Sequence, residues 1–466
     1  MGAGAAGLTV AAVAAQLGVR TVLIERGAMG GECLNTGCVP SKALLAAAKA
    51  AQSVRTISRF GIEAAEPRVD FAAVHRHVHE VIAAIAPHDS VERFEGFGVE
   101  MVRAEARFIG PREIIAGNRA ISARRIVVAT GSEPAIPPVL GIEAVPYLTN
   151  ETIFENAVLP EHLLIVGAGA IGIELAQAYR RLGSRVTLIE AVTAMPRDDA
   201  ELVAALLQCL AAEGIAIHQH TAIKRAEPNG GGVALTVEHD GRDRRLEGSH
   251  LLVAAGRKPR TAELDLERAG VRYGQDGIHV DRRLRTTARG VYAIGDVIAG
   301  APRLTHAGSC EAGIVIRNAL FRLPARVDYS ALPWVTYTDP ELAQIGLTEA
   351  EARRCHGADV AVSRLDFAGN DRAQAERETL GTAKIVSRRN GRILGASILG
   401  AHAGELIQLW TLALGKGLSL RDVAGMIAPY PTFGEIGKMA ASEFYKPKLF
   451  GRWSRLAVRA LTRLPG

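Results

Sequence analysis

The 466-residue chain contains little cysteine and no long apolar run. Its five cysteines are too few and too scattered for the disulfide framework of a secreted protein, so we expect a reducing cytoplasm. Hydrophobic residues make up 48% of the chain and can fill sizeable cores, but no apolar segment is long enough to cross a bilayer. The net charge of +6 is spread along an arginine-rich chain and gives no reason to expect nucleic-acid binding. At about 150 residues per domain, the length suggests about three domains.

The N-terminus lacks the basic residues of a signal peptide, although residues 1–18 are small and apolar. A G-x-G-x-x-G fingerprint stands there instead, at Gly2, Gly4 and Gly7. Such a turn binds a pyrophosphate at a helix N-terminus, and Glu25, after an expected strand over 21–24, would receive ribose hydroxyls. Only Met1 precedes the first glycine, where the fingerprint requires a central β-strand. We therefore expect that several residues of this strand are missing, through a late start site or a truncated chain, and that their loss exposes the neighbouring strands.

A second copy of the fingerprint predicts a second dinucleotide site. It stands at Gly167, Gly169 and Gly172. Glu190 follows its first glycine by the same number of residues as Glu25 follows Gly2. Each copy closes with a buried strand and a small-residue turn, IVVATG with Thr130 and Gly131 in the first and LLVAAG with Gly256 in the second. Two copies of one βαβ-based module indicate two bound dinucleotides.

Two cysteines, Cys33 and Cys38, lie in the segment GGECLNTGCVPSK over residues 30–42. Pro40 suits the first turn of a helix, and the alanine-rich run 43–51 continues it. Cys38 therefore lies near a helix N-terminus, where the helix dipole favours a thiolate, and Cys33 is close enough to form a disulfide with it. A redox-active dithiol follows. Two buried apolar cysteines or half of a zinc site are the alternatives, although no second Cys or His pair has ligand spacing.

Together these motifs resemble the class I pyridine nucleotide–disulfide oxidoreductases, a flavoenzyme family that includes dihydrolipoamide dehydrogenase, glutathione reductase and mercuric reductase. The resemblance covers almost the whole chain. It implies an α/β homodimer with two Rossmann-like dinucleotide-binding domains, for FAD and NAD(P), and a C-terminal α+β dimerisation domain. The expected boundaries are 1–145 and 257–328 for FAD, 146–256 for NAD(P), 329–448 for dimerisation and 449–466 for a basic tail.

The resemblance also assigns roles to residues. The first fingerprint, Glu25, Thr130, Gly131 and Asp296 would bind FAD, and the second fingerprint with Glu190 and Gly256 would bind the nicotinamide cofactor. Cys38 would face the flavin, whereas Cys33 would remain accessible and exchange with substrate. The catalytic lysine beside the flavin would be Lys42, with Glu174 as its partner.

The identity of the nicotinamide cofactor depends on the carboxylate of Glu190. A carboxylate binds the free 2′-hydroxyl of NADH and repels the 2′-phosphate of NADPH, so NADH is the expected cofactor. NADPH remains an alternative because Arg197 lies seven residues further along the chain.

The C-terminal region lacks a histidine that the family normally carries in a catalytic His-Pro-Thr, followed by a glutamate. Here the segment reads Tyr430-Pro431-Thr432, with Glu435 downstream. Tyrosine, with a pKa near 10, is a poor base for thiols at neutral pH. A tyrosine here is typical of mercuric reductases and a mercuric-reductase-like group, although the chain has neither their N-terminal metal-binding domain nor their C-terminal cysteine pair. A packed tyrosine in an enzyme with another acceptor is equally open.

Three functions therefore remain possible for the chain. The first is mercuric-reductase-like transfer to a metal ion, and the second is that of a divergent dihydrolipoamide dehydrogenase. The third is a redox-sensing flavoprotein that binds a membrane or protein partner through its basic tail.

Two further groups of residues lie outside these motifs. The histidines of an expected helix over 71–85, His75, His77 and His79, should spread around its surface, so we expect a solvated face and no metal site. In the tail, arginines recur at helical spacing among apolar residues. A solvated helix is the expectation there, and peripheral contact with anionic lipid is the alternative.

Overall fold

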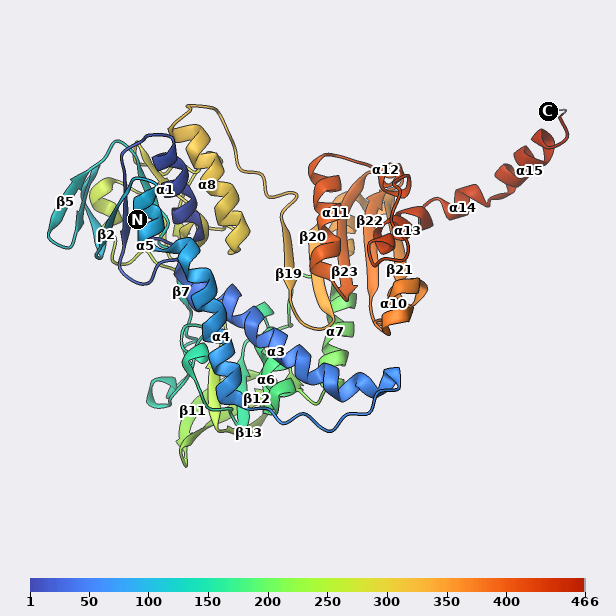
Figure 1. The fold of residues 1–466 in the computed structure, drawn as a ribbon, viewed down its shortest axis with the longest axis horizontal. Coiled ribbons are helices and arrows are strands. Elements are labelled where there is room, and N and C mark those ends of the chain that lie inside the picture. Colours follow the sequence, from blue (N-terminus) through green and yellow to red (C-terminus); the bar gives the residue numbers. More distant parts are fainter. Residues whose placement is uncertain (465–466) are drawn as a thin grey trace. The chain divides into compact units, whose positions relative to one another are not determined.

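The structure is a computed structural model and describes residues 1–464. Its chain divides into two compact units, and Figure 1 labels the helices and strands of both. Unit 1 holds Met1–Arg55, Ala64–Val192 and Ile215–Asp328, and unit 2 holds Thr56–Glu63, Thr193–Gly214 and the chain from Tyr329 onward.

In unit 1 the first nucleotide module combines α1 (Ala5–Gln16) with two separate pairs of parallel strands. The pairs are β1 (Thr21–Glu25) with β2 (Val99–Arg103), and β6 (Ile126–Val128) with β18 (Val291–Ala293). The first two residues donate and accept backbone hydrogen bonds with both pairs. The N–H of Gly2 donates to Ile24 of β1 at 2.8 Å, and the N–H of Ala129, just after β6, donates to the carbonyl of Met1 at 2.8 Å. Burial lowers the pKa of the Met1 amino group to about 6.

The second module is a four-stranded parallel sheet in the order β10-β9-β8-β14. Its strands are β8 (His162–Val166), β9 (Arg185–Ile189), β10 (Ala216–His218) and β14 (His250–Val253). Leu163, Leu164 and Ile165 are completely buried, as expected for a parallel strand with both faces covered. α6 (Ala170–Leu182) follows β8 directly and ends at Gly183, whose φ of 120° suits a residue without a side chain.

Smaller antiparallel ribbons and further helices complete unit 1. The ribbons are β3 (Ala106–Gly110), β4 (Glu113–Ala116) and β5 (Arg119–Ser122); β7 (Ser132–Pro134) with β15 (Arg257–Pro259); β11 (Ala222–Asn229), β12 (Gly232–His239) and β13 (Arg242–Gly248); and β16 (Tyr273–Gly274) with β17 (Gly277–Ile278). The helices are α2 (Gly31–Asn35), α3 (Cys38–Thr56), α4 (Phe71–Ile85), α5 (Val91–Gly96) and α8 (Thr305–Ala319).

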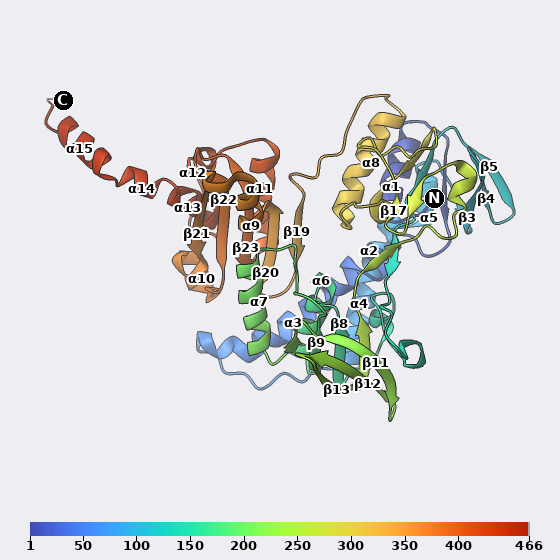
Figure 2. The same ribbon diagram turned by 180° about the vertical axis from the view of Figure 1, so that it is seen from behind.

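Unit 2 is an antiparallel sheet in the order β19-β20-β23-β22-β21 with helices around it (Figure 2). Its strands are β19 (Pro333–Thr336), β20 (Glu341–Gly346), β21 (Val360–Asp366), β22 (Thr382–Arg388) and β23 (Ile393–Gly400). Its helices are α7 (Ala200–Ala212), α9 (Glu349–His356), α10 (Asp371–Glu376), α11 (Ala403–Gly415), α12 (Leu420–Ala424), α13 (Glu435–Glu443), α14 (Lys446–Leu449) and α15 (Arg452–Leu461). Trp410 of α11 is fully buried in the core of this unit.

A buried cation joins three elements of unit 2. The Nζ of Lys384 in β22 lies 2.9 Å from Asp199, 3.1 Å from Glu201 and 2.8 Å from Glu349. Only 4% of the Lys384 and Asp199 side chains is exposed. Burial opposes the charge on Lys384, but the hydrogen bonds to the three carboxylates outweigh it and raise the pKa. These pairs attach α7 and α9 to the sheet.

Candidate functional site

The first glycine-rich turn leaves no room for side chains. Gly2 has a φ of 97°, and a Cβ there would lie 2.2 Å from the carbonyl oxygen of Ala129. A Cβ on Gly7 would lie 2.0 Å from the carbonyl oxygen of Gly2. Gly4, in contrast, is the N-cap of α1, and the nearest atom to a Cβ there would be 4.0 Å away. The tight turn therefore presents the N-terminus of α1 on an open side, which fits a bound phosphate.

The second turn repeats this geometry. Gly167 has a φ of 106°, and its Cβ would lie 2.4 Å from the carbonyl oxygen of Ala254. A Cβ on Gly172 would lie 1.9 Å from the carbonyl oxygen of Gly167. Gly169 is the N-cap of α6, and no atom would lie within 4 Å of a Cβ there. The internal repeat predicted from the sequence is thus a structural repeat as well.

The two acids also occupy equivalent places. Glu25 accepts a hydrogen bond from the N–H of Ala3 at 2.6 Å, and Glu190 accepts one from the N–H of Ala168 at 2.8 Å. In each case the donor follows the first glycine of the fingerprint, so each carboxylate lies beside its phosphate turn. A ribose bound at this turn would meet the carboxylate.

The predicted closing turns lie where the sheet strands end. The hydroxyl of Thr130 donates to the carbonyl of Arg260 at 2.9 Å, and the carbonyl of Gly131 accepts from the N–H of Arg260 at 3.0 Å. In the second module the carbonyl of Gly256 accepts from the N–H of Ala135 at 3.0 Å.

The two cysteines lie on consecutive helices, α2 and α3, as free thiols. Cys33 belongs to α2, and Cys38 is the first residue of α3. The Sγ of Cys38 lies 3.4 Å from the Oγ1 of Thr305, which is the first residue of α8. Two helix N-termini therefore converge on Cys38, and both dipoles favour a negative charge there.

The electrostatics of the two thiols are opposite. The pKa of Cys38 is lowered to about 6, first by a hydrogen bond from Cys33, then by Thr305 and by the charge of Lys42, against an opposing effect of burial. The pKa of Cys33 is raised, by its hydrogen bond to Cys38 and by burial. Cys38 is exposed and Cys33 is half-buried.

Lys42 and Glu174 form an ion pair at this site. The Nζ of Lys42, one turn along α3 from Cys38, lies 2.8 Å from the Oε2 of Glu174. The Glu174 side chain, on α6, is 6% exposed. The structure thus brings together the lysine and glutamate that were predicted as partners, although 132 residues separate them.

A polar cluster that sequence reasoning missed surrounds Asp296. The hydroxyl of Ser132 donates to Asp296 at 2.6 Å, and the Nε of Arg257 donates to the hydroxyl of Ser132 at 2.8 Å. Arg257 also pairs with Glu32 and donates to Asn150 at 3.2 Å. Burial raises the pKa of Glu32 to about 7 despite the opposing charge of Arg257. The sequence did contain a signal for this cluster. Glu32 directly precedes Cys33, Ser132 directly follows Gly131, and Arg257 directly follows Gly256.

In unit 2, Tyr430 lies in the loop between α12 and α13, and Glu435 follows it at the start of α13. The hydroxyl of Tyr430 donates to the Oδ2 of Asp371 at 2.9 Å, and its side chain is largely exposed. This hydrogen bond and the charge of Asp371 raise the pKa of Tyr430. Glu435 begins α13 and accepts from the N–H of Thr432 at 3.2 Å. No sequence signal pointed to Asp371.

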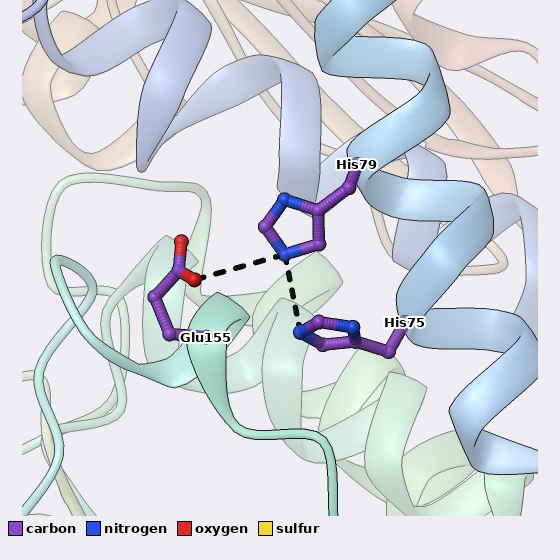
Figure 3. A group of neighbouring side chains, drawn as sticks. All are labelled: His75, His79 and Glu155. Atoms are coloured by element: carbon purple, nitrogen blue, oxygen red, sulfur yellow. Dashed lines mark hydrogen bonds and ion pairs between the residues drawn. The ribbon is translucent and has the colours of Figure 1, made fainter.

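The histidines of α4 differ from the expectation. His77 is exposed, but His75 and His79 face each other with ring centroids 4.4 Å apart, and Glu155 lies beside them (Figure 3). The sequence predicted a spread of all three around the helix. The difference arises because residues four apart lie one above the other on one helix face.

Comparison with known proteins agrees with this architecture. Residues 1–312 match the family described as pyridine nucleotide-disulphide oxidoreductase, and residues 332–441 match its dimerisation domain. The chain belongs to the pyridine nucleotide-disulphide oxidoreductase family. It is an FAD-dependent oxidoreductase with a mixed α/β fold, as the sequence predicted, and its dimerisation domain supports a homodimer.

Individual relatives carry two different activities. The chain is 37% identical to a mercuric reductase of Streptomyces lividans over 452 residues, which cover 95% of each chain. It is 38% identical to a dihydrolipoyl dehydrogenase of Thermus scotoductus over 451 residues, covering 95% of this chain and 96% of the relative. Among solved structures, the HOCl-induced flavoprotein disulfide reductase RclA of Escherichia coli superposes with a TM-score of 0.84 and 28% identity, over 95% of this chain and 98% of RclA.

Within residues 1–464, every helix is too short or too polar to cross a bilayer.

Proposed function

We propose that this enzyme passes two electrons from NADH through FAD to a Cys33–Cys38 disulfide and then to a soft metal ion, in the manner of its mercuric reductase relatives. The observation that carries the proposal is the polarised thiol pair. A disulfide that takes up two electrons and one proton becomes one thiolate and one thiol, and the opposite pKa shifts put the thiolate at Cys38 and the proton on Cys33. Oxidation back to the disulfide returns both electrons and releases that proton.

The cofactor site fits FAD. The turn at Gly2 and Gly7 is closed to side chains, and Glu25 accepts from the N–H of Ala3 beside it. We expect Glu25 to accept from the ribose hydroxyls of FAD, and Asp296, which accepts from Ser132, to accept from the ribityl hydroxyls. FAD supplies two-electron transfer between the nicotinamide and the disulfide. Lys42, neutralised in part by Glu174, supplies a positive charge beside Cys38 and thereby favours its thiolate.

The acceptor is inferred from the protons that each reaction needs. Reducing a disulfide substrate to two thiols consumes two electrons and two protons, whereas reducing Hg²⁺ to Hg⁰ consumes two electrons and no proton. The hydroxyl of Tyr430 already donates to Asp371, and its pKa is raised, so it is a poor proton shuttle at neutral pH. A metal ion is therefore the better acceptor, and a divergent dihydrolipoamide dehydrogenase is the alternative.

NADH is the proposed electron donor. The carboxylate of Glu190 lies at the second phosphate turn, where it would accept from a ribose 2′-hydroxyl and repel a 2′-phosphate. Arg197 was the residue that favoured NADPH, but in unit 2 its guanidinium lies over the ring of Trp334, 5.5 Å from the centroid.

The proposal includes the domain boundaries given above and a homodimer in which Tyr430 and Glu435 reach the partner's active site. Exposed apolar surface beside Tyr430 supports a protein contact there. The Ile427 side chain is 97% exposed, and Tyr430 itself is 71% exposed. Large apolar side chains that are exposed together typically mark an interface.

A second candidate function is peripheral contact of the tail with an anionic membrane. α15 has no buried residue, and Trp453 on it is 81% exposed. Leu456, Val458 and Leu461 of α15 are exposed as well. Four arginines lie among these apolar residues, at positions 452, 455, 459 and 463. Basic and apolar faces on one helix favour the interface of an anionic bilayer.

The deciding experiment measures NADH oxidation by the purified holoenzyme with Hg²⁺, lipoamide, glutathione disulfide or a quinone as acceptor. We expect the highest kcat/KM with Hg²⁺. Cys33→Ser should abolish that activity, and Cys355→Ser, which removes an exposed thiol of unit 2, should not. Full activity in Cys33→Ser would remove the dithiol from the electron path, and a higher kcat/KM with lipoamide would favour the alternative.

A further inference from the structure

We propose that His75, His79 and Glu155 form a binding site for one divalent transition-metal ion, with Zn²⁺ as the ion that suits it best. The site lies wholly in unit 1 and is separate from the cysteines (Figure 3). It is formed by one face of α4 and by the 3₁₀ turn Ile153–Glu155, which leads toward β8.

The spacing of the donor atoms fits a tetrahedral ion. The Nε2 atoms of His75 and His79 are 3.1 Å apart. Two ligands at 2.0–2.1 Å from a tetrahedral ion lie about 3.3 Å apart. The Oε2 of Glu155 is 3.9 Å from the Nε2 of His79, and all three ligand atoms lie within 4.8 Å of one another. The Glu155 side chain is 68% exposed, so a rotation can bring its carboxylate closer.

Several electron-rich atoms converge on one ring nitrogen of His79. The Nε2 of His79 lies within reach of three electron-rich atoms: the Nε2 of His75, the carbonyl oxygen of Phe154 at 3.2 Å, and the Glu155 carboxylate. One ring nitrogen carries at most one proton, which cannot point at three acceptors in good geometry. A divalent cation is attracted to all four groups at once. Two imidazoles with oxygen ligands suit Zn²⁺, and among biological divalent ions they disfavour Ca²⁺ and Mg²⁺.

Both sides of the site are held by buried neighbours. Val78, between the two histidines, is 2% exposed, and Ile153 and Phe154 are 0% and 6% exposed. The hydroxyl of Tyr179, on α6, donates to the carbonyl of Ile153 at 3.4 Å. The ligands therefore extend from fixed backbone, and a bound ion would link α4 to the chain that enters the second module.

The test is a calorimetric titration of the oxidised, full-length holoenzyme with Zn²⁺ alone. The variants are His75→Gln and His79→Gln, with His77→Gln as the matched control because His77 is exposed on the same helix. Other zinc-binding groups are identical in all four proteins. We expect one site per chain in the wild type and in His77→Gln, and at least tenfold weaker binding at that site in the other two.

A second readout identifies the ligands. With Cu²⁺ as a paramagnetic probe, electron paramagnetic resonance should show coupling to two imidazole nitrogens in the wild type and His77→Gln, and to fewer in His79→Gln.

Equal zinc affinity in all four proteins, or no zinc bound to the wild type, would overturn the proposal. If a histidine variant loses FAD, Glu155→Gln decides instead, because its side chain is mostly exposed. Weaker zinc binding in that variant supports the site, and unchanged binding overturns it.

Discussion

Replacing Thr305 by valine should raise the pKa of Cys38 while leaving the volume of the site almost unchanged. The Thr305 hydroxyl lies 3.4 Å from the Cys38 sulfur and is one of the groups that lower its pKa to about 6. A hydrogen bond to a charged group contributes about 1.5–3 kcal/mol. Because the contact between Thr305 and Cys38 is long and the thiol is exposed, we expect this hydrogen bond to contribute about 1.5 kcal/mol or less. Since one pKa unit corresponds to about 1.4 kcal/mol, the pKa of Cys38 should rise by about one unit.

The consequence is largest just above the wild-type pKa. At pH 6.5 a thiol with a pKa of about 6 is roughly three-quarters thiolate, and one with a pKa of about 7 is roughly one-quarter thiolate. Because only the thiolate is alkylated, the rate of Cys38 modification by iodoacetamide at this pH should fall about threefold in Thr305→Val. Above pH 8.5 the two rates should converge, because both thiols are then ionised.

The assay follows alkylation of the reduced holoenzyme between pH 5 and pH 9 and quantifies the Cys38 peptide by mass spectrometry. Thr305→Ser is the matched control, because it keeps the hydroxyl and should keep the wild-type midpoint. An unchanged midpoint in Thr305→Val would show that the hydroxyl does not stabilise the thiolate. Equal shifts in both variants would assign the effect to packing and would refute the reasoning.

Four further predictions concern other parts of the chain. Glu190→Ala should lower the ratio of kcat/KM for NADH over NADPH by about tenfold, the equivalent of about 1.4 kcal/mol, in steady-state assays. Lys384→Met should lower the free energy of unfolding by about 3–5 kcal/mol in urea titrations, because it leaves the buried Asp199 carboxylate without its cation; Lys384→Met combined with Asp199→Asn should recover part of the loss. Tyr430→His should raise lipoamide-dependent NADH oxidation at least tenfold and change the Hg²⁺-dependent rate less, since it restores a proton shuttle. Removing the residues after Lys448 should leave NADH oxidation unchanged and reduce cosedimentation with anionic vesicles; equal sedimentation of both proteins would exclude a lipid contact of the tail.

The features that could be predicted from the sequence are those that local geometry dictates. A Cβ on Gly2 or Gly167 would collide with a carbonyl oxygen, so the phosphate turn requires glycine and its pattern can be recognised in the sequence. The position of Cys38 at the start of a helix follows in the same way from Pro40 and the alanine-rich run, and α3 does begin at Cys38. Such constraints act over a few residues, and the sequence displays them directly.

The polar partners could not be predicted, because they depend on how distant segments pack. Arg257 meets Glu32 across 225 residues, and Tyr430 meets Asp371 across 59. Neither pair has a spacing that any helix or strand period would reveal. Lys42 and Glu174 lie 132 residues apart and were paired only through resemblance to the family. Periodicity cannot supply such a pairing.

The histidines of α4 lie between these two cases. Their spacing of four residues is enough to place His75 and His79 on one helix face, and this half of the arrangement follows from the helical period alone. The other half is Glu155, which arrives from a turn seventy-six residues after His79 and has no spacing relation to the helix. A pair of histidines one turn apart is common on solvated helices, so it became a candidate metal site only when the fold supplied a third ligand and a nearby carbonyl oxygen. Two ligands can be found from a helical period, whereas the third ligand, which determines whether a cation is bound tightly, is a property of tertiary structure.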